Sequence, residues 1–526
     1  MFANEELSVL LSEDRPLPAA VIRAIHNVGH SLRKGVHVNM ASHAESRRSF
    51  LSQAGGIGAS IFIGALLSAC SGGGGGASPT AAPTAAAAPT QAASGAVAGT
   101  TPTQQPAPAA AQSTTKGKIE LVAWAHWDQG IQWIIDAMKD YNFPNPNITI
   151  KKVVYPYDEV HAKMLAACVS GVGQPDIMRI EQGKMSTFLQ GQPCFVDIKP
   201  LIGDKIKDLV VGSALDYWTW KGHVYGIGDE MNACAYAYRK TFLEKYKIKM
   251  PFDTWNDVRQ QGLALKEASP NTAIISWHDQ HDGDFQTLLF AAGGLMFDSN
   301  GDFGGDNDLG RQILTMMHDM IHKDKTAIAA PVTGNQLWSS PIYWEAFRKD
   351  EVATAVGPPW HIGNLGQQTQ IGPSQSGQWY IQKLPTGFGA NKPTATQGGT
   401  SMSIPGGSKY HDEAWSVIEF CNLTKAVLED HNQRGILPTY IPALQDPSVQ
   451  KKWDYYGGEN TGALYLELAK SMPSIYQSPW APQIHTAFQN DVITPYLQNP
   501  NATANDLNNM FAKLKTDIEK AKSQTQ

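Results

Sequence analysis

The sequence predicts an α/β protein with two lobes, preceded by an export signal and a flexible tether. Segments with strand and helix patterns alternate from residue 117 onward, with short loops between them. Residues 117–526 are too many for a single hydrophobic core, so we expect two lobes. The residues before this region have the composition of a signal and a linker, and they are expected to lie outside the fold.

The first segments of the globular region predict a parallel sheet. A strand, helix, strand, helix order with short loops requires parallel pairing, as in a doubly wound α/β lobe. The expected strands are residues 119–124, 147–154 and 175–180, and the expected helices are residues 130–141, 157–170 and 182–190.

The later elements are signalled by local motifs. A hairpin is expected at residues 217–225, and strands at residues 235–239 and 273–277. Thr254 is suited to cap a helix that begins at Trp255. An Asn-Gly turn predicts a second hairpin at residues 297–303. The chain is expected to end in a helix with one apolar stripe, formed by Leu507, Met510, Phe511, Leu514 and Ile518.

The N-terminal region contains an export signal pattern. Arg47 and Arg48 precede a short apolar segment, residues 54–67, which predicts twin-arginine export. The segment is too short and too rich in glycine for a membrane span. It ends in Leu67-Ser-Ala-Cys70, which resembles a lipoprotein box and implies lipid attachment at Cys70. The alternative is a buried helix and an unrelated cysteine. The true start is either Met1 or Met40, because the stretch ahead of the arginines is long for a signal.

Residues 71–116 form the expected tether. They consist almost entirely of Gly, Ala, Ser, Thr, Pro and Gln, and residues 71–115 include no aromatic or charged side chain. Such a segment cannot bury enough apolar surface to offset the entropy of ordering it. A flexible chain of this length reaches roughly 35–40 Å, which would keep the globular part near a membrane.

Composition excludes several classes of function. The chain is 17% charged and 42% hydrophobic, with a formal net charge of −6, so a nucleic-acid partner is not expected. No apolar run after the signal approaches the length of a membrane span. We expect a monomer without a cofactor.

The cysteines of the globular region do not form a disulfide scaffold. One or two disulfide bridges are as compatible with the sequence as buried free thiols. Export in the folded state makes obligatory disulfides less expected. The cysteines concerned are Cys168, Cys194, Cys234 and Cys421, of which the first two are closest in sequence.

Several loose motifs, specific through their order, resemble those of one protein family. The chain is similar to the extracellular solute-binding proteins of ABC importers, in particular the carbohydrate-binding family that includes maltose-binding protein. The motifs are Trp124-Ala-His-Trp-Asp128, Gly173-Gln-Pro-Asp-Ile177, Tyr225-Gly-Ile-Gly-Asp-Glu-Met-Asn232, Pro251-Phe-Asp-Thr-Trp-Asn-Asp-Val258, Ala355-Val-Gly-Pro-Pro-Trp360 and Gln397-Gly-Gly-Thr-Ser401.

The resemblance implies a periplasmic-binding-protein-like fold with a ligand cleft between two α/β lobes. Three crossings are then expected near residues 231–233, 399–401 and 437–441. Lobe one would comprise residues 117–231 and 400–438, and lobe two residues 232–399 and 439–526. The implied function is capture of an oligosaccharide or polyol by hinge closure and delivery to ABC permease subunits, at the outer face of the cytoplasmic membrane.

Aromatic side chains are the first candidates for ligand contacts. Sugar rings present apolar C–H faces that stack on aromatic rings, and all 14 tryptophans lie at or after Trp124. Most tryptophans are core residues, which is the alternative at each position. Trp360 occupies a position at which similar family members stack a ring on the ligand. The expected stacking residues are Trp124, Trp127, Trp360 and Trp480.

Polar residues near strand ends and crossings complete the expected site. Asp128 follows the first strand, and Glu181 and Gln182 follow the third. The alternatives are surface charges for the acids and simple turns for the glycines. The remaining candidates are Asp229 and Asn232 at the first crossing, Gly398 and Gly399 at the second, and Asp284. The family position puts either Asp284 or Phe285 at the cleft rim.

Two other functions stay open at this point. The loop from His278 to Asp284 carries metal-capable side chains, but such clusters are often only solvated loops, so no metal is expected. Residues 298–309 resemble a calcium loop but lack its glycine and its closing glutamate. No nucleophile elbow, Walker loop or zinc motif is present in the sequence, so we expect a protein that is not an enzyme. An exported glycoside-active enzyme, or a two-lobed metal- or peptide-binding protein, is the alternative.

Overall fold

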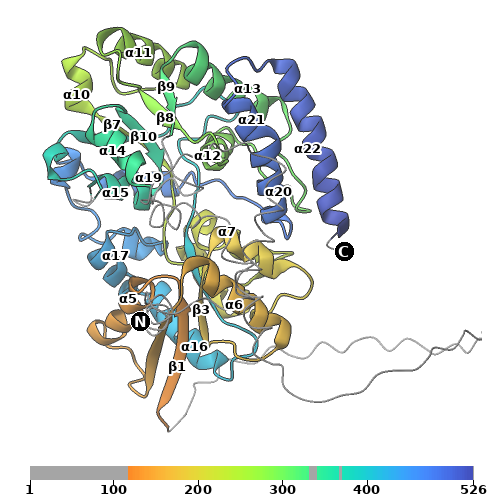
Figure 1. Cartoon of the computed structure of the whole chain (residues 1–526). Coiled ribbons are helices and arrows are strands. Elements are labelled where there is room, and N and C mark those ends of the chain that lie inside the picture. Colours follow the sequence, from red (N-terminus) through yellow and green to blue (C-terminus); the bar gives the residue numbers. More distant parts are fainter. Residues whose placement is uncertain (1–116, 331–339, 367–369, 525–526) are drawn as a thin grey trace, which may run out of the picture. The chain divides into compact units, whose positions relative to one another are not determined.

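A mixed five-stranded sheet organises the first part of the fold (Figure 1). The computed structural model describes residues 117–330, 340–366 and 370–524, all within one unit that spans Ala107–Gln526. The export signal at Arg47 and Arg48, the lipidation site Cys70 and the tether at residues 71–116 lie outside the described residues.

The three expected parallel strands are neighbours on one side of this sheet, with β2 at its edge. Strand β1 pairs in parallel with β2, starting at Ile119 opposite Ile148, and with β3. Strand β12 runs antiparallel to both of its neighbours, β3 and β6, so the sheet is mixed and not wholly parallel. The reason is that β12 enters the sheet at the edge where β3 ends, with Thr400 opposite Glu181. The strand order is β2 (Ile148–Val154), β1 (Ile119–Ala125), β3 (Ile177–Glu181), β12 (Thr400–Ser403) and β6 (Ile227–Gly228).

Helices cover both faces of the first sheet. On one face, buried residues of α5 and α16 share a hydrophobic cluster with those of β1. On the other face, Val160 and Met164 of α6 share a second cluster with Met178 and Ile180 of β3. The helices of this part are α5 (Gln129–Asp140), α6 (Tyr157–Ser170), α7 (Gln182–Met185), α8 (Lys199–Ile202), α9 (Val211–Ala214), α16 (His411–Asn422) and α17 (Leu428–Arg434).

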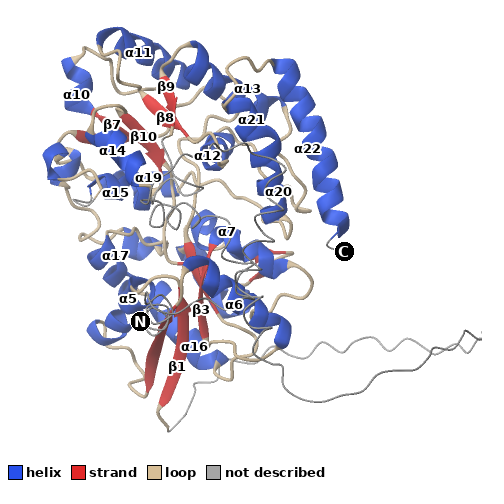
Figure 2. Ribbon diagram, viewed as in Figure 1, coloured by secondary structure: helices blue, strands red, loops and turns tan. Residues whose placement is uncertain are grey.

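A smaller antiparallel sheet organises the second part, in the order β10 (Thr354–Gly357), β7 (Ala235–Arg239) and β11 (Trp379–Gln382). The strands of the two sheets form separate groups in Figure 2. Two further pairs are parallel β8 (Ile275–Trp277) with β9 (Ala327–Ala329), and antiparallel β4 (Thr219–Trp220) with β5 (His223–Val224).

Helices also surround the second sheet, and several of them have well-defined starts. Thr254 caps α11, as the sequence predicts, and the structure adds an exchange of hydrogen bonds with Asp257. The helices are α10 (Lys240–Lys245), α11 (Trp255–Ala268), α12 (Gly283–Ala291), α13 (Asp308–His318), α14 (Pro341–Arg348), α15 (Pro359–Gly366), α18 (Ile441–Leu444), α19 (Thr461–Ala469), α20 (Ala481–Phe488), α21 (Thr494–Leu497) and α22 (Ala504–Gln524).

The terminal helix α22 buries the stripe that its sequence predicts, with Leu507, Phe511, Leu514 and Ile518 in the core and Met510 half-buried. It packs beside α20 (Figure 1). Among the described residues, no helix is both long and apolar enough to cross a membrane.

Three segments of backbone run next to one another between the two sheets. Met231 N donates to Leu437 O at 2.7 Å, and Cys234 N donates to Ala395 O at 2.9 Å. Isolated bridges pair Glu230 with Pro438 and Ala233 with Thr396. The connection from β6 to β7 is therefore hydrogen-bonded both to the connection from β11 to β12 and to the one from α17 to α18.

Local differences from the sequence expectations have simple causes. The helix expected over residues 182–190 divides into α7 and a 3-10 turn, Ser186–Leu189. The hairpin expected at residues 297–303 is present, but only as a single bridge between Phe297 and Phe303. Its strands are too short to extend the pairing beyond the Asn-Gly turn.

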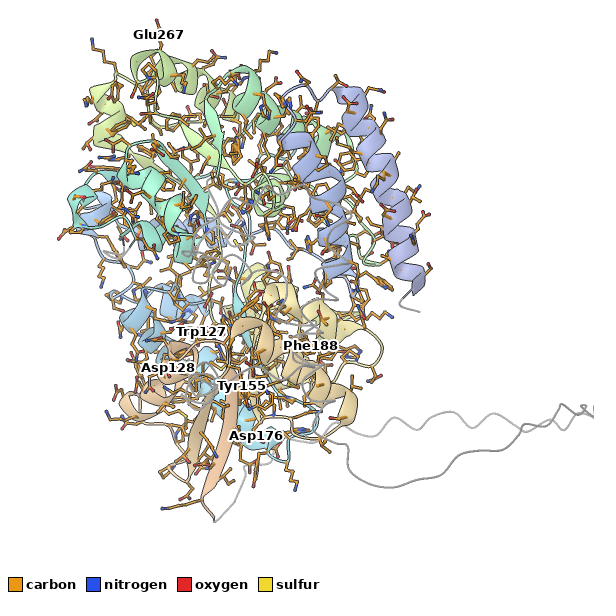
Figure 3. All side chains as sticks on the ribbon, in the orientation of Figure 1. Trp127, Asp128, Tyr155, Asp176, Phe188 and Glu267 are labelled. Atoms are coloured by element: carbon orange, nitrogen blue, oxygen red, sulfur yellow. A yellow bond between two sulfur atoms is a disulfide. The ribbon has the colours of Figure 1, made fainter. Side chains whose placement is uncertain are left out.

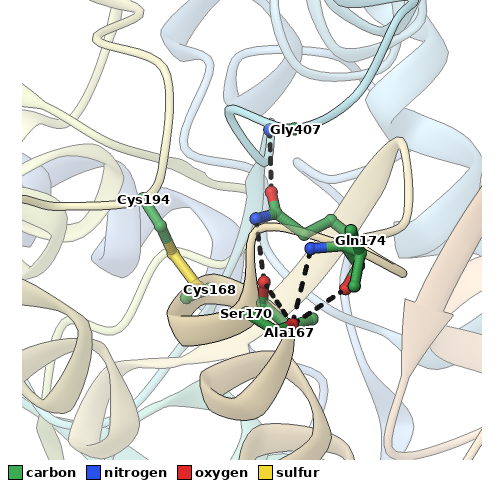
Figure 4. Close-up of a disulfide and its surroundings, with 7 residues drawn as sticks. Ala167, Cys168, Ser170, Gln174, Cys194 and Gly407 are labelled. Carbon is green, nitrogen blue, oxygen red and sulfur yellow. Dashed lines mark hydrogen bonds between the residues drawn. A yellow bond between two sulfur atoms is a disulfide. The ribbon is translucent and has the colours of Figure 1, made fainter.

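One disulfide joins Cys168, near the end of α6, to Cys194 (Figure 4). Their Cα atoms are 5.6 Å apart, and 26 positions separate them in the sequence. Cys234 and Cys421 are buried free thiols. Export in the folded state made an obligatory disulfide less expected, yet the structure contains this bridge. The close approach of the α6 terminus to the loop at Cys194 could not be read from the sequence.

Candidate functional site

The parallel strands place several predicted residues at one edge of the first sheet. Strand β1 ends at Ala125 and β3 at Glu181, and parallel strands end at the same edge. Trp127 and Asp128 therefore lie near the residues that follow β2, and Figure 3 labels both of them close to Tyr155. This is the edge at which open α/β sheets bind ligands.

An aromatic cluster occupies this edge. Trp124 meets Tyr155 edge to face, with ring centroids 5.4 Å apart. The His126 ring lies 5.0 Å from Tyr157 and 4.1 Å from Trp127. Burial lowers the pKa of His126 to about 3, with nearby positive groups adding to the effect, so its imidazole is neutral at physiological pH.

Glu181 is bound to this cluster through Tyr157. Its carboxylate accepts a hydrogen bond from the Tyr157 hydroxyl at 2.9 Å and another from Gly183 N at 2.8 Å. Burial raises the pKa of Glu181, and both hydrogen bonds oppose that rise. Asp128 is more exposed and pairs with Lys152 at 2.6 Å.

Trp127 lies against two guanidinium groups. The Arg179 group is 5.3 Å from the centre of its ring, and the Arg434 group is 5.6 Å from it. Its ring also lies so close to Gly130 that a methyl group there would be 2.6 Å from it. Cation–π contacts of this kind hold the ring in one orientation.

Arg179 is part of a buried ionic network beside the first crossing. Its guanidinium donates two hydrogen bonds to Asp229, at 2.8 and 3.2 Å, and both side chains are fully buried. Arg434 pairs with Asp430 at 2.5 Å and approaches Glu230 at 3.6 Å. Burial raises the pKa of Glu230, against the attraction of Arg434. Asp229 thus serves the network, and its carboxylate oxygens are both occupied.

Four predicted residues meet at the second crossing. Trp360, at the start of α15, donates from Nε1 to Gln397 O at 3.3 Å. A methyl group at Gly398 would lie 3.0 Å from the Trp360 ring, and one at Gly399 would lie 2.3 Å from Asn232 Nδ2. Both glycines have positive φ, at 78° and 116°. The absence of side chains therefore allows the ring and the amide to approach the backbone.

Gln182 joins this group through its backbone, because Gln182 N donates to Gly399 O at 2.9 Å. Asn232 is fully buried, and its Nδ2 donates to Glu230 O at 2.8 Å. The crossing thus brings Gln182 and Asn232 into one assembly with Trp360 and the two glycines.

Asp284 lies in the first turn of α12, and its carboxylate accepts from His278 N at 2.7 Å. Burial raises the pKa of Asp284 to about 6. The neighbouring Asp282 instead accepts from His485 at 2.6 Å, which lowers its pKa. Across residues 117–330, 340–366 and 370–524, no group of three or more His, Cys, Asp and Glu side chains is arranged to hold a metal ion. Asp282 also accepts from Gln489, and Asp279 accepts from Gln498, so these two acids of the loop bind side chains near the C-terminus of the chain.

Trp480 lies apart from these groups. It precedes α20 and lines a pocket together with Trp220, Leu189 and Gln190. The structure therefore gathers most of the predicted residues into a strand-end group and a second-crossing group. Asp229 lies in the ionic network, Asp284 lies in the first turn of α12, and Trp480 lines a separate pocket.

Sequence reasoning missed several residues that belong beside these groups. His126 and Tyr157 join the strand-end cluster. Gln397 carries a buried Nε2 that has no hydrogen-bond partner, as does His126 at Nδ1 and Asn232 at Oδ1. Buried polar atoms usually have partners, so these three atoms are candidates for binding ligand hydroxyls. The position of Gln397 within the Gln397-Gly-Gly motif was the available signal.

Comparison with known proteins points to one family. Residues 125–427 match the model described as bacterial extracellular solute-binding protein. The arabinooligosaccharide-binding protein of Halalkalibacterium halodurans is 24% identical over 394 residues, which cover 74% of this chain and 87% of that protein.

Solved structures share the fold at low sequence identity. The galacto-N-biose/lacto-N-biose I-binding protein of a Bifidobacterium longum ABC transporter has a TM-score of 0.63 and 16% identity, covering 77% of this chain and 99% of that one. The sugar-binding protein MalE of Xanthomonas citri has a TM-score of 0.63 and 17% identity, covering 77% and 98%. These likenesses confirm the expected two-lobed α/β fold.

Proposed function

Because the chain belongs to the bacterial extracellular solute-binding proteins, we propose that it captures a carbohydrate outside the cytoplasm and delivers it to an ABC importer. The similar proteins are named as sugar-binding proteins, one of them from an ABC transporter, which supports a binding role without catalysis. The arabinooligosaccharide-binding relatives support an oligosaccharide as the ligand.

The second crossing is the observation that carries this proposal. Trp360 offers an aromatic ring next to the side-chain-free backbone of Gly398, and the buried Nε2 atom of Gln397 has no hydrogen-bond partner. An apolar ring face beside unsatisfied polar groups matches the two surfaces of a sugar, namely its C–H face and its hydroxyls. The strand-end cluster, with Glu181 and Tyr157, supplies further polar groups at the same edge.

Closure of two lobes around the sugar is the proposed mechanism. We assign residues 117–231 and 400–438 to lobe one, and residues 232–399 and 439–526 to lobe two. The hydrogen bonds that link Met231 to Leu437 and Cys234 to Ala395 support a hinge at these boundaries. A ligand that contacts both lobes binds the closed form more tightly and shifts the equilibrium toward it. Micromolar capture requires about 8 kcal/mol, which stacking and several hydrogen bonds can supply.

Anchoring outside the cytoplasm completes the proposal. Arg47 and Arg48 would direct export, and lipid attached at Cys70 would hold the protein on the outer face of the cytoplasmic membrane. The tether at residues 71–116 would let the lobes reach the permease subunits.

A thermal-shift screen of the full-length protein tests the ligand class. The probes are arabino- and malto-oligosaccharides of one to five units (the oligosaccharide ladder), together with polyols, peptides and divalent metal ions. We expect sugars or polyols to raise the melting temperature, because ligands that bind only the folded state stabilise it. Stabilisation by metals or peptides alone would overturn the carbohydrate assignment, and release of shorter products from the ladder would indicate an enzyme.

Trp360→Ala tests the site itself. We expect it to remove most of the sugar affinity while leaving the melting temperature of the free protein nearly unchanged, because Trp360 is only half-buried. Trp415→Ala, at a half-buried tryptophan of α16, is the matched control and should leave affinity intact. Unchanged affinity in Trp360→Ala would remove this residue from the site.

A further inference from the structure

The buried ionic network beside the first crossing also joins that crossing to the third one. Glu230 comes directly before the first crossing and forms a bridge with Pro438 at the third. Arg434 ends α17, and the chain turns at Gly435, where φ is 71°, before it reaches the third crossing. The Arg434 guanidinium lies 3.6 Å from the Glu230 carboxylate. This ion pair therefore connects the two segments at which the proposed hinge would bend.

The same guanidinium lies against a predicted ligand residue. The centre of the Trp127 ring is 5.6 Å from the Arg434 guanidinium and 5.3 Å from that of Arg179. The Arg179 side chain is fully buried, whereas the Arg434 side chain is 18% exposed and Trp127 is half-buried. A sugar that stacks at Trp127 would therefore remove water from Arg434 and from the network behind it.

The charges of this network do not balance. It contains the three carboxylates of Asp229, Glu230 and Asp430, and the two guanidiniums of Arg179 and Arg434. If every group were ionised, the network would carry one uncompensated negative charge inside the protein. Because an uncompensated buried charge is strongly unfavourable, one of the three carboxylates is expected to hold a proton near neutral pH.

Glu230 is the carboxylate that suits this proton. Asp229 accepts two hydrogen bonds from Arg179, at 2.8 and 3.2 Å, and Asp430 accepts two from Arg434, at 2.5 and 2.7 Å. The 3.6 Å between Arg434 and Glu230 is too long for a hydrogen bond. Burial raises the pKa of Glu230 to about 7. Burial also raises the pKa of Asp430, but its hydrogen bonds from Arg434 oppose that rise.

Two other titratable groups near the network keep one form around neutral pH. His126 lies close to both guanidiniums, and burial lowers its pKa to about 3, so it stays neutral. Cys421 interacts with Asp229 and is fully buried, and burial raises its pKa, so it stays a thiol. Guanidinium groups remain charged throughout. A proton that this network exchanges near neutral pH is therefore assigned to Glu230.

Removing water from the network favours its protonated form. Desolvation destabilises a group of charges most when the charges do not cancel. With Glu230 protonated the charges of the network cancel, and with Glu230 ionised they do not. A neutral sugar at Trp127 should therefore raise the pKa of Glu230, with the proton coming from the solvent.

We propose that Glu230 takes up a proton when a sugar covers Trp127, so that capture of the sugar is linked to proton uptake at the hinge. The inference rests on the proposed function. It makes the affinity for sugar depend on pH. The affinity is highest below about pH 6, where Glu230 is already protonated in the free protein, and it falls as the pH rises until Glu230 is ionised in the bound protein too.

Isothermal titration of the full-length wild type with the oligosaccharide ladder, in phosphate and in Tris buffer, tests the inference. The two buffers have very different heats of ionisation, so the difference between the observed heats gives the number of protons taken up per sugar bound. We expect about half a proton at about pH 7.5 and almost none at about pH 9.5. The affinity should fall about three- to ten-fold between about pH 6 and pH 9.

Glu230→Gln identifies the group that takes up the proton, because it keeps the size of the side chain and cannot titrate. It should abolish both the proton uptake and the pH dependence of the affinity. Glu345→Gln is the matched control, because Glu345 pairs with Arg348 at the surface of α14, and it should keep both. Proton uptake that persists in Glu230→Gln would overturn the assignment to Glu230.

The wild-type titration decides the inference even if Glu230→Gln does not fold. Sugar binding without proton uptake at about pH 7.5, or uptake that does not decline toward about pH 9.5, would overturn the proton linkage and leave carbohydrate binding intact. Absence of binding for every sugar of the ladder would instead reject the proposed function, and this inference with it.

Discussion

The buried pair of Arg179 and Asp229 provides the sharpest test of how the first crossing is held. Asp229→Asn keeps the size of the side chain and removes its charge, which leaves the Arg179 guanidinium buried without its bidentate partner. Breaking a fully buried ion pair costs about 3–5 kcal/mol. Glu230 and Asp430 still attract the guanidinium, so we expect a loss near the lower limit, about 3 kcal/mol.

Urea denaturation followed by circular dichroism measures this loss. Asp158→Asn is the matched control, because Asp158 pairs with Lys184 at 2.9 Å but its side chain is 84% exposed. An exposed pair contributes at most about 1 kcal/mol, so the control should unfold nearly as wild type does. The double variant Arg179→Met with Asp229→Leu should recover most of the stability, because apolar side chains of similar volume can replace a buried pair. Equal losses in Asp229→Asn and Asp158→Asn would refute the reasoning.

Three further predictions concern stability. Replacing Cys168 and Cys194 by serine should lower the free energy of unfolding, measured in urea, by about 3.5 kcal/mol, because the unfolded chain loses the constraint of the closed loop. A reductant added to wild type should lower the free energy of unfolding by the same amount. An unchanged free energy of unfolding in the serine variant and in reduced wild type would contradict this prediction. Because the pKa of Asp284 is raised to about 6 in the folded state, the folded protein binds this proton more tightly than the unfolded chain does. Wild type should therefore lose stability relative to Asp284→Asn as the pH rises from about 4 to about 6.5. A difference in free energy of unfolding between the two proteins that does not change with pH would contradict this prediction. Gly399→Ala should lower the free energy of unfolding by about 2 kcal/mol, because φ is 116° at this residue and the added methyl group would meet Asn232. Gly363→Ala is the control, because a methyl group there has open space, and the free energy of unfolding in urea should stay the same or rise slightly.

Local patterns in the sequence predicted most of the helices and strands of the first sheet. Alternation placed β1, β2 and β3 within about two residues of their observed bounds, and it placed α6 at its observed residues, because each element buries one face on its neighbour. Thr254 alone was enough to predict the start of α11 at Trp255. By contrast, the antiparallel insertion of β12 depends on a connection that returns from the second sheet, and no local pattern encodes it.

The candidate site was less accessible to sequence reasoning. The order of the motifs located the second crossing, where Trp360, Gly398 and Gly399 meet. The partner of Asp229, however, lies 50 positions away in the chain, so the sequence could not distinguish a ligand-binding acid from a buried ion pair. The same limit applied to Trp220, because only the folded structure shows that it lines one pocket together with Trp480.

The central claim is that this protein binds a carbohydrate without altering it. Isothermal titration of the full-length protein with the oligosaccharide ladder, followed by chromatography of the recovered sugar, tests that claim most directly. We predict saturable binding of one sugar per protein with a dissociation constant in the micromolar range or tighter, and recovery of the sugar at its original length. The absence of binding heat for every sugar and polyol, or recovery of shortened products, would contradict the account.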